Sequence, residues 1–490
     1  MPIRRASFLS IVVLLLLSCG GGREDRIRSV ENGLLPPLLR EDDPAPGWTI
    51  GERMRRYNVP GAAVVVIDEG RIDWMKGYGV RESGGRDSVD ARTLFPVSSL
   101  TMPVTASAAL RLADEGRLDL DRDVNGFLRR WRVPEVAHLS GAPVTVRRIL
   151  SHDAGLTLRG FEGFRPDERL PSLVEILEGS GRARNAPVAV DRPPGSGFRW
   201  SAGGYAVLRL VLEEITGEPF DAWMERTLFD PLDMNRTMFN YPGGPPDDLP
   251  MAAHHLIDGF VTRGTVRIYP ELAAQGLWTT AEDLALWMIA LGEAWTGRSD
   301  HLLSRERARE MLTPAAGDWG LGLSVGGGEG PVRFSHGDGG FGCGGRLASL
   351  PEEGRGAVVL TNGESGGRLA AEILRSVAEA YQWPSFRVHR IRESGLDPSV
   401  LPRLAGEYEV EDMPGLTRAR ILVEEGIPAI RMLGVSAPLA AASPARYFSV
   451  DAEIECRFDL PAGGGPATGF DLFWRGAPAR ATRTGRTAGP

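Results

Sequence analysis

Ser99 is the first residue of this chain whose type and position suggest chemistry. It precedes residues 100–115, where small and apolar residues recur at helical spacing, so we expect it to stand at a helix start. A serine hydroxyl attacks a carbonyl carbon when a neighbouring group takes its proton. His336 and Asp338 lie two residues apart in a predicted strand, so their side chains share a face. A His–Asp pair of this kind activates serine in other hydrolases, and it is one candidate base for Ser99.

Five segments of the chain combine small, polar and aromatic residues in a fixed order. They are FPVSSLTMPVTA (95–106), ILSHDAGL (149–156), PGSGFRWSAGGY (194–205), YPELAAQGLWTT (269–280) and SHGDGG (335–340). Their order and spacing resemble the serine β-lactamase and D-Ala-D-Ala carboxypeptidase-like family, in its class C-like esterase branch. The resemblance covers roughly residues 45–385 and implies acyl transfer through a serine nucleophile.

The resemblance assigns Ser99 to the nucleophile and Met102 to the position of the general base. The family places a lysine there, three residues after the serine, because that spacing returns to nearly the same helix face. A thioether does not accept a proton at neutral pH, so Met102 cannot replace the amine. The resemblance also implies an oxyanion hole made by backbone N–H groups of Ser99 and Gly339.

The other two family motifs are altered as well. Trp200 stands at the tyrosine of the Tyr-x-Asn motif, and its indole only donates hydrogen bonds. Ala202 replaces the asparagine of the same motif. His336 fits the first residue of the Lys- or His-x-Gly motif, whereas Asp338 replaces its glycine. A carboxylate at Asp338 would repel a developing oxyanion if it pointed into the site.

Several of these residues also have a structural interpretation. Ser99 can serve as an N-cap rather than as a nucleophile, since serine is a favoured cap. His152 belongs to a structural turn of the family, and Tyr205 is expected in the core of its helix. Lys76 is expected to be a solvated charge. Trp278 either borders the cleft or packs, and the sequence leaves both open.

The composition excludes several classes of function. The 490 residues carry a formal charge of −8, with 24% charged and 42% hydrophobic residues, which is an ordinary globular balance. A mildly acidic chain without basic blocks is a poor nucleic-acid binder. Only one of the 56 basic residues is a lysine, Lys76, and it lies outside the motifs. The cysteine and histidine spacings signal no metal site, and we expect no cofactor.

The first residues predict export. Residues 1–18 combine a basic start with an apolar run that is too short to span a bilayer, which is typical of a signal peptide. LLSC at 16–19 resembles a bacterial lipobox, so we expect lipidation at Cys19 and anchoring in the cell envelope or periplasm. Residues 19–45 suit a flexible tether. Whether the remaining cysteines, Cys343 and Cys456, pair with each other is left open.

The elements that must position these residues predict a mixed α/β fold, of the α+β kind. We expect an antiparallel sheet of the β-lactamase/transpeptidase type with an inserted helical region over residues 46–385, a linker at 386–399 and a small antiparallel β domain at 400–485, similar to an appended lipocalin-like domain. Predicted strands are 62–68, 71–80, 321–325, 332–336, 345–350 and 356–361 in the first region, and 406–410, 418–423, 447–450 and 454–460 in the second. Predicted helices are 100–115, 202–216, 281–294 and 368–381.

Two hypotheses about function follow. In the first, the chain is a catalytically degenerate member of the family that acts by binding a peptide, an ester or a peptidoglycan-like small ligand. In the second, it is a slow serine esterase or peptidase that forms an acyl-enzyme at Ser99 with help from His336 and Asp338. Both hypotheses share one fold, so only the site can separate them.

Overall fold

The computed structural model describes residues 22–134, 141–239, 249–261, 267–326, 330–411, 413, 416–474 and 477–484. The predicted signal peptide and Cys19 lie outside these ranges, and so does the side chain of Asp338, whose backbone belongs to a strand. In the part of the chain that is described, no helix is both long and apolar enough to cross a membrane.

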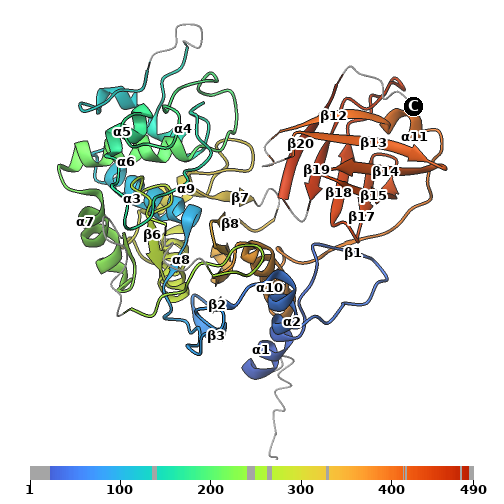
Figure 1. The fold of residues 1–490 in the computed structure, drawn as a ribbon, viewed down its shortest axis with the longest axis horizontal. Coiled ribbons are helices and arrows are strands. Elements are labelled where there is room, and N and C mark those ends of the chain that lie inside the picture. Colours follow the sequence, from blue (N-terminus) through green and yellow to red (C-terminus); the bar gives the residue numbers. More distant parts are fainter. Residues whose placement is uncertain are drawn as a thin grey trace, which may run out of the picture.

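A six-stranded antiparallel sheet joins early and late parts of the chain, as predicted (Figure 1). Its spatial order is β3-β2-β10-β9-β8-β7. The strands are β2 (Gly61–Asp68), β3 (Arg71–Gly79), β7 (Ser324–Gly326), β8 (Arg333–Gly340), β9 (Cys343–Leu350) and β10 (Arg355–Thr361). β7 starts later than the sequence predicted, because Gly322 has a φ of 95° that interrupts the extended chain.

The helical region lies between β3 and β7 in the sequence. Its α-helices are α3 (Thr101–Asp114), α4 (Val146–Leu150), α5 (Leu173–Glu178), α6 (Ala202–Thr216), α7 (Phe220–Met224), α8 (Ala281–Thr296) and α9 (Arg305–Met311). A three-stranded sheet in the order β4-β6-β5 consists of β4 (Phe95–Pro96), β5 (Met238–Phe239) and β6 (Leu277–Thr279). Single 3-10 turns are Ser98–Leu100, Val124–Gly126, Asp230–Leu232 and Pro351–Glu353, and a π turn is Glu225–Phe229.

The six-stranded sheet has an α8 face and an α10 face. Alternate residues of each strand point to opposite faces, so Phe334, Leu347 and Val358 join the core with α3, α6 and α8. Ala348 and Val359 point the other way, into a second core with α2 (Ile50–Tyr57) and α10 (Gly366–Ala380). His336 of β8 pairs with Leu347 and therefore shares the α8 face.

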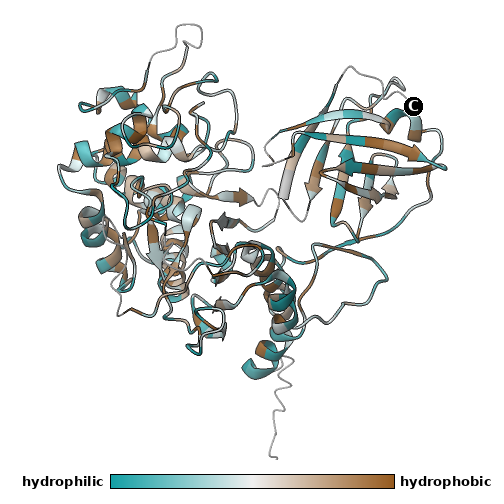
Figure 2. Cartoon of the chain, in the orientation of Figure 1, coloured by the Kyte–Doolittle hydropathy of each residue, from teal (hydrophilic) through white to brown (hydrophobic). Residues whose placement is uncertain are grey.

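The predicted flexible tether at 19–45 is wrong for the residues that are described. This segment contains α1 (Arg23–Glu31), which is mostly hydrophilic (Figure 2), and β1 (Leu38–Arg40), which pairs in parallel with β11 (His389–Ile391). Val30 and Leu34 are fully buried in the core with α10. The predicted linker thus also carries a strand. Helix α1 is held by the burial of Val30 and by ion pairs of Arg26 with Asp73 and of Glu31 with Lys76.

The predicted C-terminal β domain is confirmed as a nearly closed, barrel-like antiparallel sheet. Its order is β15-β14-β13-β12-β20-β19-β18-β17-β16, and the short helix α11 (Leu401–Leu404) precedes it. The strands are β12 (Gly406–Glu411), β13 (Arg418–Glu424), β14 (Ile427–Met432), β15 (Val435–Pro438), β16 (Ala440–Ser443), β17 (Arg446–Ser449), β18 (Ile454–Phe458), β19 (Gly469–Trp474) and β20 (Ala477–Arg483). Cys456 lies in β18 and Cys343 in β9, in different sheets, and they are not bonded to each other.

Candidate functional site

Ser99 lies in the 3-10 turn that leads into α3, and its side chain is half-buried. The preceding residue, Ser98, has a φ of 38°, an unusual backbone conformation for a residue with a side chain. Helix α3 begins at Thr101 with Leu100 as N-cap and no side-chain cap. The expectation that Ser99 caps this helix is therefore wrong, since the tight turn places it one residue too early.

Strand β8 runs alongside this turn. A Cβ atom at Gly340 would lie 2.9 Å from the Ser98 hydroxyl, so the strand approaches the turn as closely as a glycine permits. Gly339, the predicted oxyanion residue, has open space where a side chain would be. The structure thus brings together the two backbone segments that were predicted to form an oxyanion hole.

Gln275 fixes the turn from the opposite side, and the sequence analysis did not single it out. Its side-chain amide donates to the Ser98 hydroxyl at 3.3 Å and accepts from the Phe161 backbone N–H at 2.9 Å. The sequence signal that could have indicated a role for Gln275 was its place in the 269–280 segment, two residues before β6. Its amide is a positioning group, because it acts on the neighbour of Ser99.

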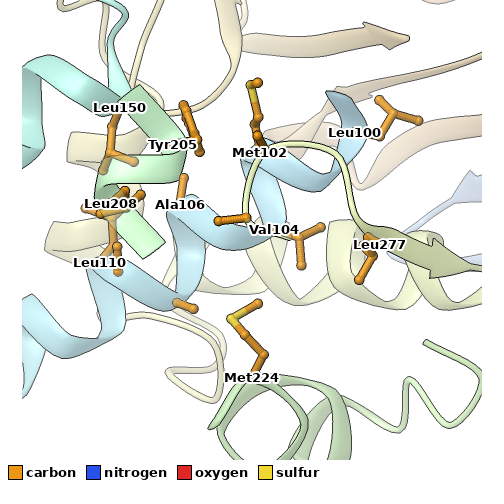
Figure 3. Packing of buried hydrophobic residues seen from close by; sticks show 14 of the residues in the cluster. Leu100, Met102, Val104, Ala106, Leu110, Leu150, Tyr205, Leu208, Met224 and Leu277 are labelled. Carbon is orange, nitrogen blue, oxygen red and sulfur yellow. The ribbon is translucent and has the colours of Figure 1, made fainter. Parts of the chain in front are cut away.

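Met102 is fully buried one turn into α3. It belongs to the apolar core that also contains Val104, Ala106 and Tyr205, as Figure 3 shows. An amine in this environment would lose its hydration, and burial would lower its pKa. The position that the family reserves for a basic group is thus apolar in this chain, and not merely occupied by a different polar residue.

Trp200 and Ala202 occupy the start of α6. The Trp200 indole donates to the Arg159 carbonyl at 3.0 Å. An indole N–H only donates, so Trp200 cannot accept a proton as the family's tyrosine would. Ser201 is the N-cap of α6 and accepts from the Gly204 N–H. Ala202 is buried, and its methyl group has no hydrogen-bonding capacity. The amide that the family uses to hold a substrate therefore has no counterpart at this position.

His152 is buried against Trp200, with a ring centroid distance of 4.4 Å. Its Nδ1 accepts from the Ser201 N–H at 3.1 Å, so a neutral ring carries its proton on Nε2. Burial lowers the pKa of His152 to about 3, with smaller effects from His336 and Arg159. The ring is thus neutral at physiological pH and is held by a turn, in agreement with its structural interpretation.

His336 is also buried, and its ring lies between Trp200 and Trp319 at centroid distances of 5.7 and 5.5 Å. Among the described residues, neither ring nitrogen forms a hydrogen bond, so His336 does not hold the Ser99 hydroxyl. Burial lowers the pKa of His336 to about 4. The predicted dyad with Asp338 depends on a side chain outside the description, and it stays a prediction.

These residues form an aromatic cluster, which consists of His152, Phe198, Trp200, Tyr205, Trp319 and His336. Phe198, Trp200 and Trp319 are half-buried, so the cluster reaches the surface. Several of its polar atoms are buried without a partner in the described part of the chain: His152 Nε2, both nitrogens of His336, Trp319 Nε1 and the Tyr205 hydroxyl. Buried polar groups without partners are uncommon and mark a place where water or a ligand supplies them.

Two further ionisable groups near these segments are neutral at pH 7. Burial raises the pKa of Tyr205 well above its ordinary value, so its phenol stays protonated. Burial also raises the pKa of Glu271 to about 8, with smaller opposing effects from its own backbone and from Arg209. The burial of Glu271 was not predicted, because the neighbouring residues in the sequence carry no signal that this glutamate is buried.

The remaining candidates lie elsewhere or pack. Lys76 projects from β3, is exposed and forms an ion pair with Glu31 of α1, so it cannot serve as a base for Ser99. Trp278 is buried in β6, which resolves its two interpretations in favour of packing. In the described ranges, no group of His, Cys, Asp and Glu side chains is arranged to hold a metal ion.

Comparison with known proteins identifies the family of the chain. The family model described as Beta-lactamase matches residues 49–382. The chain belongs to the beta-lactamase family. Esterase EstB of Burkholderia gladioli is 31% identical over 194 residues, which cover 37% of this chain and 48% of that protein. The chain spans about half the length of the curated relatives it matches.

Solved structures resemble the chain over most of its length. The octameric penicillin-binding protein homologue from Pyrococcus abyssi superposes with a TM-score of 0.57 at 21% identity, over 88% of this chain and 98% of that one. The structure of SurE gives a TM-score of 0.58 at 23% identity, over 89% and 97% of the two chains. At these identities the likeness establishes the fold. Relatives of this beta-lactamase-family chain are serine hydrolases, and in this chain β8 lies beside the turn that contains Ser99.

Proposed function

We propose that this chain is a non-hydrolytic member of the beta-lactamase family that binds a ligand beside Ser99. The observation that carries the proposal is Met102, which is fully buried among apolar side chains at the position of the family's general base. A base contributes about 10² to 10⁴-fold to the rate of such a reaction. His152 and Tyr205 do not replace it, because one has a pKa of about 3 and the other keeps its proton.

The aromatic cluster supplies the binding surface in this proposal. Its half-buried rings offer apolar area at the surface, and its unpartnered polar atoms offer donors and acceptors behind them. A ligand with small apolar groups and several amide or ester groups matches this combination. We therefore favour a peptide, an ester or a peptidoglycan-like small molecule. Lipidation at Cys19 would hold the protein at the membrane of the cell envelope, where such ligands occur.

One observation favours the second candidate, a slow serine hydrolase. His336 has a pKa of about 4 and is therefore neutral at pH 7. One nitrogen of a neutral imidazole carries no proton, and this nitrogen can accept one. It also points to the same face of the sheet as Phe334 and Leu347, toward α3. Its nitrogens would have to gain a hydrogen bond to Ser99 when a substrate binds.

Covalent labelling distinguishes the two candidates. The purified chain and its Ser99→Ala variant are treated with a fluorescent penicillin and with a fluorophosphonate, and adducts are located by mass spectrometry. We expect no labelling that depends on Ser99, because an apolar side chain, Met102, stands at the predicted position of the general base. Rapid labelling that Ser99→Ala abolishes and that His336→Phe also abolishes would establish the hydrolase instead.

Binding and anchoring are tested separately. Calorimetry with an N-acetylmuramyl pentapeptide should show saturable binding to Ser99→Ala as well as to the unaltered chain, and weaker binding to Trp319→Ala. Equal affinity of Trp319→Ala would exclude the aromatic cluster as the binding surface. In a bacterial host fed radiolabelled palmitate, Cys19→Ala should abolish incorporation into the protein, and retained label would refute the anchor.

A further inference from the structure

A cavity on the α10 face lies on the opposite side of the six-stranded sheet from Ser99. Its volume is about 300 Å³, and its wall combines residues of β9, α10 and the barrel-like sheet. The charged residues of this wall are Arg346, Arg368, Arg375, Glu372 and Glu453. Because a water molecule takes about 30 Å³ of liquid volume, a cavity of this size admits on the order of ten waters or a small organic anion.

The two glutamates of the wall are already engaged. Glu372 accepts hydrogen bonds from Arg53 and from the Tyr57 hydroxyl, and the Arg53 pair is buried on both sides. Glu453 lies 3.6 Å from Arg368, so these two charges largely offset each other. Both negative charges of the wall are therefore balanced by other arginines, and the charges of Arg346 and Arg375 are in excess.

Arg346 and Arg375 have no acidic partner within the described ranges. Each guanidinium is held by one hydrogen bond from its Nε to a backbone carbonyl, Arg346 to Gly367 at 3.2 Å and Arg375 to Leu35 at 2.8 Å. Both terminal nitrogens of each group remain for a ligand. Burial lowers the pKa of both side chains, that of Arg375 to about 10. Among the nearby charges, Glu372 and Glu453 oppose this effect on Arg375, and Arg346 adds to it. Two like charges thus lie near each other, partly buried, and neither forms an ion pair with a described residue.

We propose that this cavity binds a small molecule through a phosphate group. A guanidinium presents paired N–H donors that match two phosphate oxygens, and a dianion offsets the charges of both Arg346 and Arg375. The N-terminus of the 15-residue helix α10, which has no side-chain cap, lies at the same wall and adds positive potential. Met413 and the ring of Trp474 line the barrel side and leave room for a short organic substituent.

Calorimetry on the full chain tests the proposal with two probes at low ionic strength, inorganic phosphate and glycerol 3-phosphate. We expect one site per chain, and an affinity loss of about tenfold or more in the double variant Arg346→Gln, Arg375→Gln. The matched control is Arg418→Gln, which removes an exposed arginine of the barrel-like sheet that does not line the cavity and should bind as the unaltered chain does. Binding of both probes assigns free phosphate, and binding of glycerol 3-phosphate alone assigns a phosphomonoester.

A thermal melt separates a ligand site from a merely structural arginine pair. Without phosphate, the double variant should melt no lower than the unaltered chain, because it removes repulsion between two like charges. With phosphate, only the unaltered chain and Arg418→Gln should gain melting temperature. If the double variant does not fold, single Arg346→Gln carries the test, since it leaves the Arg375 bond to Leu35 intact. Failure of both probes to bind the unaltered chain, or equal affinity of the variant, would overturn the proposal.

Discussion

The two faces of the six-stranded sheet differ in where they bury charge. On the α8 face, the surroundings of Ser99 are apolar or neutral: Met102 is in the core, and the pKa of His336 is about 4. On the α10 face, Arg53 and Glu372 form a buried ion pair, and Arg346 lines a cavity and forms no ion pair with the residues that the structure describes. The family's chemistry needs an ionisable base beside its serine, whereas the buried guanidinium of Arg53 lies on the other side of the sheet.

This difference has a physical meaning for both faces. Removing a charged group from water is costly unless a partner or a ligand offsets the loss. Around Ser99, the α8 face avoids that cost because its groups are apolar or neutral at pH 7, and Met102 provides no base at the predicted position. The α10 face does bury charged groups, and their loss of hydration must be offset by paired glutamates or by a bound anion. The contrast makes opposite predictions for substitutions on the two faces.

The largest expected effect is on the α10 face. Glu372→Ala leaves the buried guanidinium of Arg53 without its carboxylate, and breaking such a pair costs about 3–5 kcal/mol in the free energy of unfolding. Urea denaturation of the full chain measures this loss. The double variant Arg53→Met, Glu372→Leu should recover most of the stability, because it removes both charges together. A double variant as unstable as Glu372→Ala would show that the pair acts through packing and not through charge.

The second effect is on the α8 face and is somewhat smaller. Met102→Lys places an amine in an apolar core, so we expect a loss of about 3 kcal/mol at pH 7 and little gain in ester hydrolysis. Met102→Leu is the matched control, since it keeps the volume and should cost less than about 1.5 kcal/mol. A stable and active Met102→Lys enzyme would contradict the contrast, because it would show that the α8 face still accommodates the family's basic amine.

The sequence predicted the elements of both faces well where the local signals are strong. The hairpin of β2 and β3 was predicted from Glu69-Gly70, and both residues have the positive φ values of a tight hairpin turn. The helix at 202–216 was predicted from its apolar spacing, and its bounds are those of α6. Short strands such as β15 (VSAP) and β16 (AAAS) were missed, because four small residues carry no detectable alternation.

The arrangement of the two sites could be predicted only in part. The resemblance brought Ser99 and His336 together through their motifs, but Trp319 lies between two motifs and joins the aromatic cluster only through tertiary packing. The cavity has no sequence signal at all, since Arg346 and Arg375 are two arginines among many and become special only through burial against the barrel-like sheet. Burial is a property of the whole fold, and so are the pKa shifts that depend on it.

The smallest effect concerns pH and tests whether the α8 side of the chain is built from neutral groups. The pKa of Glu271 rises on folding from 4.5 to about 8, so the folded state holds a proton that the unfolded state releases. Its contribution to stability is therefore fully present below pH 4.5 and is lost as the pH rises toward 8. Glu271→Gln should remove this loss, so the variant should gain on the order of 2 kcal/mol relative to the unaltered chain between pH 5 and pH 8. Urea denaturation at the two pH values measures the gain.

His336 provides the opposite slope on the same face. Its pKa falls from 6.5 to about 4 on folding, so its contribution is present above pH 6.5 and is lost as the pH falls toward 4. His336→Phe should therefore reduce acid sensitivity without changing the loss at high pH, whereas Glu271→Gln should do the reverse. If both variants changed the free energy of unfolding in the same pH range, Glu271 and His336 would not titrate independently of each other. The α8 face would then hold a coupled charge network, and the contrast between the two faces of the sheet would have to be given up.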